Sequence, residues 1–66
     1  MNNVLVEKID EISVISINRP HARNAVDGPT ATLLADAFRE FDADNTQKVA
    51  ILTGTEGTFC AGADLK

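Results

Sequence analysis

The stretch Lys48-Val49-Ala50-Ile51-Leu52-Thr53 decides the fold. Its four consecutive apolar residues, Val49 to Leu52, are typical of a strand covered on both faces, because successive side chains of a strand point to opposite faces. A helical pattern precedes this strand, with Leu34, Phe38 and Phe41 spaced at i, i+4 and i+7. Since another strand lies before that helix, the order predicts a βαβ unit in which residues 48–53 pair in parallel with an earlier strand.

The predicted helix has a clear beginning. Asp27 is of the type that caps helix N-termini, and Pro29 falls in the first turn, where the missing N–H costs little. The apolar stripe then continues for about four turns, and the polar residues 42–47 end it. We therefore expect an amphipathic helix whose Phe38 and Phe41 side chains face the core.

Two short strands come first in the chain. Residues 4–9 and 12–17 are rich in β-branched side chains, and only Asp10 and Glu11 separate them, which predicts an antiparallel hairpin. Alternation in the second strand places Ser13, Ile15 and Ile17 on one face. Pro20 has no N–H for a ladder and ends this part. The predicted class is therefore α/β, with the order ββαβ.

Three strands and one helix leave one face of the sheet uncovered, so we expect residues 1–66 to be the N-terminal part of a larger single domain. A chain of 66 residues buries only about 60% of the surface that its unfolded form exposes. Its one Cys and one His allow neither an internal disulfide nor a zinc set. We predict that the isolated chain is poorly folded and inactive.

The composition argues against several partners. The net charge is −4 and the six basic residues are scattered, so no basic stripe exists to neutralise nucleic-acid phosphates. No basic-then-apolar leader is visible, and no apolar run approaches the ~20 residues of a membrane span. We expect a cytoplasmic protein that binds neither nucleic acid nor membranes.

The run Cys60-Ala61-Gly62-Ala63 follows a buried strand and a glycine loop. Small side chains let a ligand or another backbone approach closely. If Ala63 and Asp64 open a helix, their free N–H groups suit an anion or a developing oxyanion. The plainer alternative is a tight strand-to-helix turn. Cys60 has no His near it in sequence, and we expect a buried, inert thiol.

Two segments together resemble the enoyl-CoA hydratase/isomerase, or crotonase, superfamily. Residues 17–26, INRPHARNAV, are similar to its N-R-P-x-x-x-N-A segment. Residues 50–54, AILTG, with residues 59–65, FCAGADL, are similar to its V-L-T-G…F-x-A-G-A-D-L segment. The resemblance covers essentially the whole chain. It implies the N-terminal ββαβ part of a crotonase-like, spiral ββα fold, incomplete in these residues.

The resemblance also implies site residues. In the family, two backbone N–H groups bind the thioester oxygen of an acyl-CoA, and the first corresponds to the N–H of Ala63. The second donor and the two catalytic glutamates of family hydratases lie beyond Lys66. Arg23 is the candidate phosphate contact, with a solvated surface arginine as the alternative. Asn24 is expected to fix the loop by local hydrogen bonds. The other substrate-binding candidates are Ala22, Ala25, Ala61, Gly62, Asp64 and Leu65, of which Asp64 is alternatively a helix-start residue.

The resemblance implies an enzyme that polarises an acyl-CoA thioester and stabilises its enolate, with addition of water to an enoyl-CoA as the first expectation. Other family members run isomerase, dehalogenase, hydrolase or synthase chemistry on the same scaffold. The implied partners are the acyl-CoA, the remainder of the crotonase chain, and further copies in a homotrimer or hexamer. No metal or redox cofactor is implied, because CoA arrives with the substrate. Two alternatives stay open: a non-catalytic acyl-CoA-binding member, or a truncated fragment that is inactive without the rest of the chain.

Overall fold

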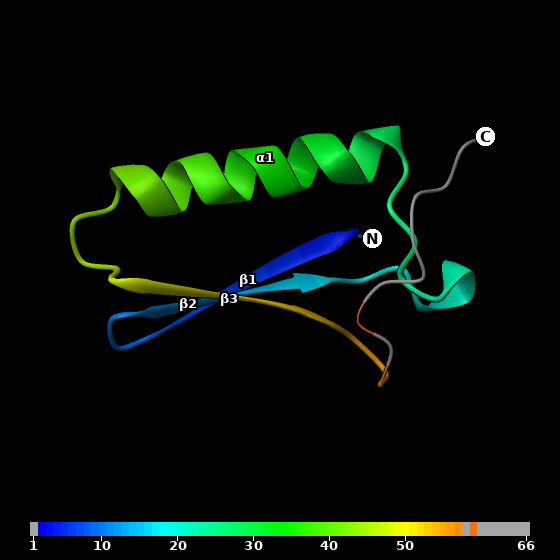
Figure 1. Ribbon diagram of the computed structural model, residues 1–66, viewed down its shortest axis with the longest axis horizontal. Helices are drawn as coiled ribbons and strands as arrows, with labels where there is room; N and C mark the ends of the chain where they lie inside the picture. The colour runs from blue at the N-terminus through cyan, green and yellow to red at the C-terminus, as the bar shows by residue number, and fades with distance from the viewer. Residues whose placement is uncertain (1, 58, 60–66) are drawn as a thin grey trace.

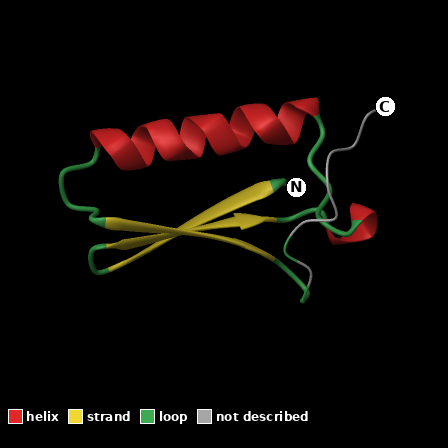
Figure 2. Ribbon diagram, viewed as in Figure 1, coloured by secondary structure: helices red, strands yellow, loops and turns green. Residues whose placement is uncertain are grey.

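The computed structural model describes residues 2–57 and 59, and it has two layers, a small sheet with one helix on one face (Figure 1). The predicted ββαβ order is confirmed, with a short 3-10 turn added after the second strand. Figure 2 shows the strands in one layer and the long helix in the other. The elements are β1 (Val4–Ile9), β2 (Ile12–Ile17), η1 (Pro20–Ala22), α1 (Gly28–Ala43) and β3 (Val49–Gly54).

The sheet has the order β1-β2-β3. Strands β1 and β2 are antiparallel, with Ile9 opposite Ile12, and β2 and β3 are parallel, with Ile15 beside Leu52. Asp10 adopts a φ of +53°, which a two-residue hairpin turn requires of its first residue. Because β2 and β3 run the same way, both end at one edge of the sheet, which we call the carboxyl edge.

Helix α1 begins where the sequence predicts. The Asp27 carboxylate accepts a hydrogen bond from the Thr30 backbone N–H at 3.0 Å, and a proline stands in the first turn. Hydrogen bonds from the Thr30 side chain and then from its backbone N–H hold the pKa of Asp27 below its usual range. The cap therefore sets where the helix begins, and it favours the charged form of Asp27.

The core lies between α1 and the first two strands. Ile15 and Ile17 on β2 are almost fully buried, together with Thr30 and Ala37 on the helix. The prediction that Phe38 faces this core is wrong, because its side chain is 38% exposed. Consecutive helix residues lie about 100° apart around the axis, so Phe38 is turned to the flank when Ala37 faces the sheet. Phe41 lies only about 40° from Ala37 around the helix axis, and it is half-buried.

The second face of the sheet is apolar and bare. The register places Leu5, Ile9, Ile12, Val49 and Ile51 on the face opposite Ile15, and all five are exposed. None of the elements in the described part of the chain lies on that side (Figure 1). The unit thus has the unfilled face that the run Val49 to Leu52 predicts, and a second layer is needed to cover it.

Candidate ligand-binding edge of the sheet

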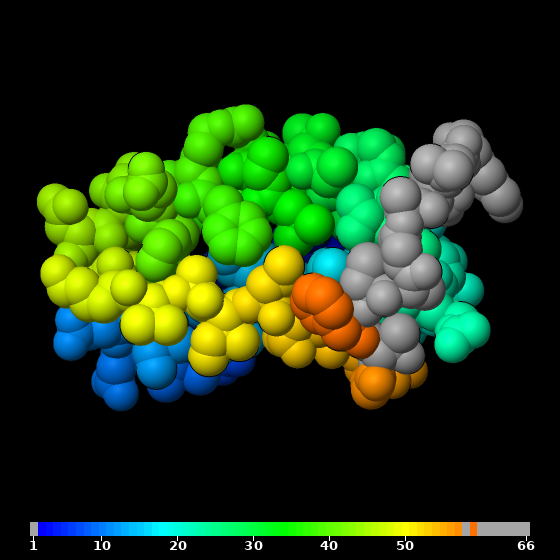
Figure 3. Space-filling view, in the orientation of Figure 1, coloured from blue at the N-terminus to red at the C-terminus, as the bar shows by residue number. Residues whose placement is uncertain are grey.

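The candidate site lies at the carboxyl edge, where the loop after β2 and the turn after β3 meet. In open α/β sheets, ligands bind in the crevice outside the carboxyl ends of the strands. Residues 18–25 and 54–57 occupy this end of the molecule, the teal and orange parts of Figure 3. Two segments that the sequence separates by about thirty residues are therefore neighbours here.

The loop after β2 is a compact turn. Pro20 opens the 3-10 turn η1, and Arg23 and Asn24 follow with φ of +53° and +58°. Asn tolerates this left-handed region well, whereas for Arg23 it costs on the order of 1 kcal/mol. The conformation is maintained by the backbone hydrogen bonds of residues 22–25.

Four consecutive backbone N–H groups of this loop, those of residues 22–25, bond inside it. Those of Ala22 and Asn24 donate to the Arg19 carbonyl at 3.0 and 2.8 Å, respectively. Those of Arg23 and Ala25 donate to the carbonyls of Pro20 and Ala22, both at 3.0 Å. None of these four N–H groups is left to bind an anion. Arg23, the candidate phosphate contact, lies in this stretch and its side chain is exposed.

Asn24 links the two segments of the carboxyl edge. Its side chain is fully buried, at 0% exposure. Its Oδ1 accepts from the Arg19 backbone N–H at 2.7 Å, and its Nδ2 donates to the Thr55 carbonyl at 2.8 Å. We call this pair of bonds the Asn24 bridge. The prediction that Asn24 fixes its own loop is confirmed, and the partner on the turn after β3 is an addition that the sequence did not indicate.

Arg19 is a second buried group that the sequence did not single out. It is 8% exposed, and its Nη1 donates to the Ala25 carbonyl at 2.7 Å. Its Nη2 lies 3.4 Å from the Asp27 carboxylate. The guanidinium thus ties the end of the loop to the cap of α1, and a buried charge is tolerated because it is paired and hydrogen-bonded.

Thr55 and Asn18 link the carboxyl edge to the segment before β1. The Thr55 N–H donates to the Ile17 carbonyl at 3.0 Å, and its hydroxyl donates to the Asn18 Oδ1 at 3.2 Å. The Asn18 N–H in turn donates to the Asn3 carbonyl at 2.7 Å. The starts of β1 and α1 and the ends of β2 and β3 are therefore connected at a single edge.

The structure brings together only part of the predicted site. Ala22 and Ala25 are half-buried and Arg23 is exposed, all three in the loop after β2. The predicted residues Ala61, Gly62, Ala63, Asp64 and Leu65, and Cys60 beside them, lie outside the described residues. Glu56, with φ of +56°, and Gly57, with φ of +81°, form the exposed turn that precedes them.

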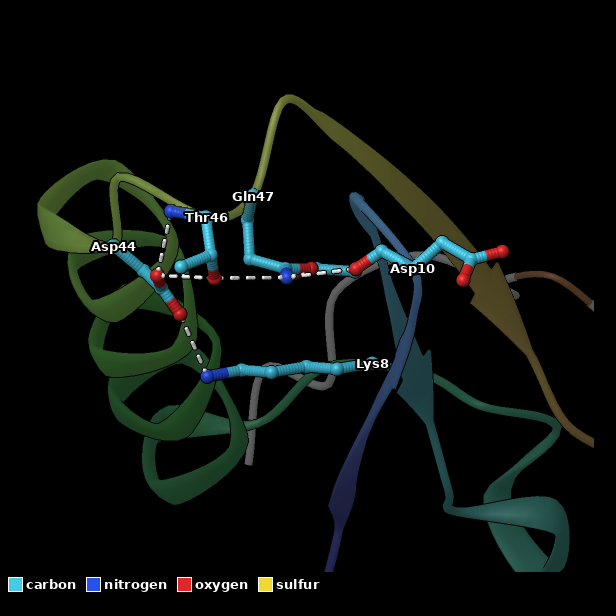
Figure 4. A network of polar contacts seen from close by, with 6 residues as sticks. Lys8, Asp10, Asp44, Thr46 and Gln47 are labelled. Atoms are coloured by element: carbon cyan, nitrogen blue, oxygen red, sulfur yellow. Dashed lines mark hydrogen bonds and ion pairs between the residues drawn. The ribbon is translucent and has the colours of Figure 1, made fainter.

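The opposite end of the sheet is held by a different polar network (Figure 4). Lys8 Nζ lies 2.8 Å from the Asp44 carboxylate, which also accepts from the Thr46 N–H and hydroxyl. Gln47 Nε2 donates to the Asp10 carbonyl at 3.1 Å, and its Oε1 accepts from the buried Ser13 hydroxyl at 2.7 Å. This network joins the hairpin turn, the end of α1 and the start of β3, and it holds none of the predicted site residues.

An open groove of about 260 Å³ lies between α1 and β1. Asp36 and Glu40 stand on its helix side, and their negative charges disfavour the phosphates of a CoA. β3 is at the other edge of the sheet. This groove is therefore not the site that the loops at the carboxyl edge define.

Two classes of site find no support in the part of the chain that the structure describes. Among residues 2–57 and 59, no three His, Cys, Asp or Glu side chains gather in a group able to hold a metal ion. The helix α1 has 16 residues, and none of the described helices is long and apolar enough to cross a bilayer.

The fold and the paired loops define an α/β unit of the crotonase type. Enoyl-CoA hydratase EchA1 from Mycobacterium marinum superposes on 96% of this chain with a TM-score of 0.93 and 51% identity, and the match covers 26% of that chain. An enoyl-CoA hydratase from Mycobacterium tuberculosis H37Rv superposes with a TM-score of 0.92 and 54% identity, over 96% of this chain and 25% of that one.

The family model described as enoyl-CoA hydratase/isomerase matches residues 7–66, and the chain belongs to that family. Enoyl-CoA hydratase EchA19 of Mycobacterium tuberculosis is 39% identical over 64 residues, which are 97% of this chain and 24% of that protein. The short-chain-enoyl-CoA hydratase of Clostridium acetobutylicum is 39% identical over 66 residues, 98% of this chain and 25% of that protein. The chain thus spans about a quarter of the length of the curated relatives that it matches.

Proposed function

We propose that this chain supplies the N-terminal part of an acyl-CoA site in an enzyme of the enoyl-CoA hydratase type. The loop Ala22 to Ala25 would contact the CoA part of the substrate, and the Ala63 N–H would be one of the two donors to the thioester oxygen. The observation that carries the proposal is the Asn24 bridge, because it joins the loop that resembles a CoA-binding segment to the turn that leads toward Ala63.

The Ala63 amide would act on charge that develops during the reaction. As a nucleophile adds to the β-carbon of an enoyl thioester, the carbonyl oxygen becomes an enolate oxygen. A fixed N–H donor stabilises that oxyanion more than the neutral carbonyl, so it lowers the barrier and not only the binding energy. The second donor and the acid and base that move protons would come from other parts of the full-length polypeptide.

The CoA part would be bound by side-chain charge and by small side chains. Arg23 is exposed, and its guanidinium offers forked donors that match a phosphate. The backbone donors of residues 22–25 are already used, which favours this side chain as the phosphate contact. Ala22 and Ala25 leave room for the chain of the ligand to approach the backbone.

Addition of water to the double bond would need attack of the water oxygen on the β-carbon and proton transfers but no oxidant or reductant, so the proposal includes no metal or redox cofactor. The full-length protein would assemble as a trimer or a pair of trimers. Sedimentation of the full-length polypeptide tests this assembly, and a monomer would contradict it.

The decisive experiment compares Ala63→Pro with Ala63→Ser in the full-length polypeptide. Proline removes the N–H, and we expect kcat for hydration of an enoyl-CoA to fall by ~10²–10³, as for other single oxyanion donors. Serine keeps the N–H and should retain most of the activity. Equal activity of the two variants would contradict the role of the amide. Binding of acyl-CoA without turnover in the unmodified protein would instead assign a non-catalytic acyl-CoA-binding member.

A further inference from the structure

The Asn24 bridge has three properties that a mere loop contact would not need. Its side chain is fully buried, at 0% exposure. Two of its bonds link different segments, one to the Arg19 N–H and one to the Thr55 carbonyl, 31 residues away. Both partners are backbone atoms, so the bridge fixes the path of the main chain in both segments and does not depend on their side chains.

The bridge also lies at a critical position along the chain. Arg23, the proposed phosphate contact, precedes Asn24 directly, and Thr55 stands eight residues before Ala63. A change in the distance between Arg19 and Thr55 would therefore shift the loop that carries Arg23 relative to the turn after β3. Misplacing a reacting group by about 1 Å can cost ~10²-fold in rate.

We propose that Asn24 is a positioning residue, which sets the spacing between the loop that carries Arg23 and the turn after β3 at Thr55. The inference rests on the proposed function. Asn24 touches neither substrate nor reacting atoms; it acts through Arg19 and Thr55.

The chemistry of the side chain allows a selective test. Asn24→Asp keeps the oxygen that accepts from Arg19, and aspartate also tolerates a positive φ. It replaces the Nδ2 donor by an oxygen, so the bond to the Thr55 carbonyl is lost while the loop keeps its own bond. Asn24→Gly keeps the conformation and loses both bonds.

Gln47 offers a matched control at the other end of the sheet. It is also a buried amide, 8% exposed, that donates to a backbone carbonyl and accepts from a second group. Gln47→Glu makes the same amide-to-acid change without touching the carboxyl edge. Any general effect of a buried acid on folding should therefore appear in both variants.

The experiment uses the full-length polypeptide and two substrates, an enoyl-CoA and the corresponding enoyl-pantetheine thioester, which lacks the nucleotide and its phosphates. If Asn24 sets the spacing, the CoA part can help the reaction only when the bridge is intact, because remote binding energy has to be delivered to the reacting centre. We expect Asn24→Asp to lower kcat/KM for the enoyl-CoA by ~10–100-fold and for the pantetheine thioester by less than about threefold. Gln47→Glu should leave kcat/KM unchanged for both substrates.

The contrary results are distinct. If Asn24 has a purely structural role, Asn24→Asp would lower kcat/KM for both substrates by the same factor, in proportion to the fraction of folded protein. That result would overturn the positioning role but not the proposed function. Unchanged kinetics in Asn24→Asp would do the same. If the unmodified protein neither binds nor converts CoA thioesters, the proposed function fails and the positioning role fails with it. Amide hydrogen exchange at Thr55, whose N–H donates to the Ile17 carbonyl, is expected to be about tenfold faster in Asn24→Asp than in Gln47→Glu, and it then shows whether the bridge holds the turn after β3 in place.

Discussion

The two ends of the sheet are both held by a bridging amide, but the surroundings of the two amides differ. At the carboxyl edge, Asn24 is fully buried beside Arg19, which is itself 8% exposed. At the opposite end, Gln47 stands next to the ion pair of Lys8 and Asp44, whose side chains are 55% and 23% exposed. A buried polar network is costly to break, because the groups left behind cannot turn to water, whereas an exposed ion pair is worth little. The fully buried amide therefore lies at the end where the ligand is proposed to bind, and the exposed ion pair lies at the other end.

The largest effect is expected from breaking the Asn24 bridge outright. Asn24→Leu would leave the Arg19 N–H and the Thr55 carbonyl without a partner, at about 1–3 kcal/mol each. Leucine at a positive φ adds about 1 kcal/mol. We predict a loss of about 3 kcal/mol or more in the free energy of unfolding of the full-length polypeptide, measured by urea denaturation. A loss under about 1 kcal/mol would show that water replaces the hydrogen bonds of the bridge. The carboxyl edge would then not be the end that is costlier to break.

A smaller loss is expected from the guanidinium beside the bridge. Arg19→Met keeps most of the side-chain volume but removes the donor to the Ala25 carbonyl and the partner of Asp27. A buried hydrogen bond from a charged group is worth about 1.5–3 kcal/mol, and we predict a loss of about 2 kcal/mol. Arg19→Lys should recover only part of it, because one ammonium cannot reach both partners with the forked geometry. Full recovery by lysine would mean that charge alone matters here.

The corresponding change at the opposite end should cost less. Gln47→Leu removes the acceptor of the Ser13 hydroxyl and the donor to the Asp10 carbonyl, but the latter lies in an exposed turn that water reaches. We predict a loss of about 1 kcal/mol in the same urea experiment and no change in the ratio of kcat/KM values for the two thioesters. A loss as large as that of Asn24→Leu would remove the contrast between the two ends.

The smallest effect is expected from the exposed ion pair, and it should depend on pH. The hydrogen bond from Lys8 and then those from Thr46 lower the pKa of the Asp44 carboxyl from its usual 3.8. Its contribution to stability is therefore present above pH 3.8 and is lost as the pH falls through the lowered folded value. Hydrogen bonding to Asp44 raises the pKa of Lys8 above 10.5, so the contribution of Lys8 is present below pH 10.5 and is lost at higher pH.

Asp44→Asn tests this dependence. The difference in Tm from the unmodified protein should be small at pH 7, should narrow steadily below about pH 4, and should shrink in high salt. A difference that stays constant from pH 7 to pH 2.5 would contradict the assignment of the stabilisation to the charge of Asp44.

How far the sequence determined these features depends on the range of the interactions. The hairpin at Asp10, the start of α1 after Asp27 and the ββαβ order follow from neighbouring residues, and all were predicted. The exposure of Phe38 was not, because periodicity gives the direction of an apolar stripe but not which of its borders meets the sheet. The bare face of the sheet was predicted, because it follows from the apolar residues of the strands themselves. The bridge from Asn24 to Thr55 was not, because it joins two loops whose residues are 31 positions apart in the sequence.

Arg19 shows the same limit within one loop. Its partners, the Ala25 carbonyl and Asp27, are close in sequence, but their positions depend on two residues with positive φ that no periodic pattern indicates. The resemblance implied a ligand contact for Arg23, and it gave Arg19 a place in the motif but no role. In the structure the two arginines divide the roles, with one buried to hold the loop and the other exposed beside it.

The most direct test of the central claim is the amide proton of Ala63, observed by selective 15N labelling in the full-length polypeptide. The ligand should be a β-ketoacyl-CoA, because its enolate is stable enough to occupy an oxyanion site. We predict a large downfield shift of this one amide proton as the ligand saturates the protein, with a weaker response in Asn24→Asp. An Ala63 resonance that stays unchanged while the ligand binds fully would show that the thioester oxygen lies elsewhere.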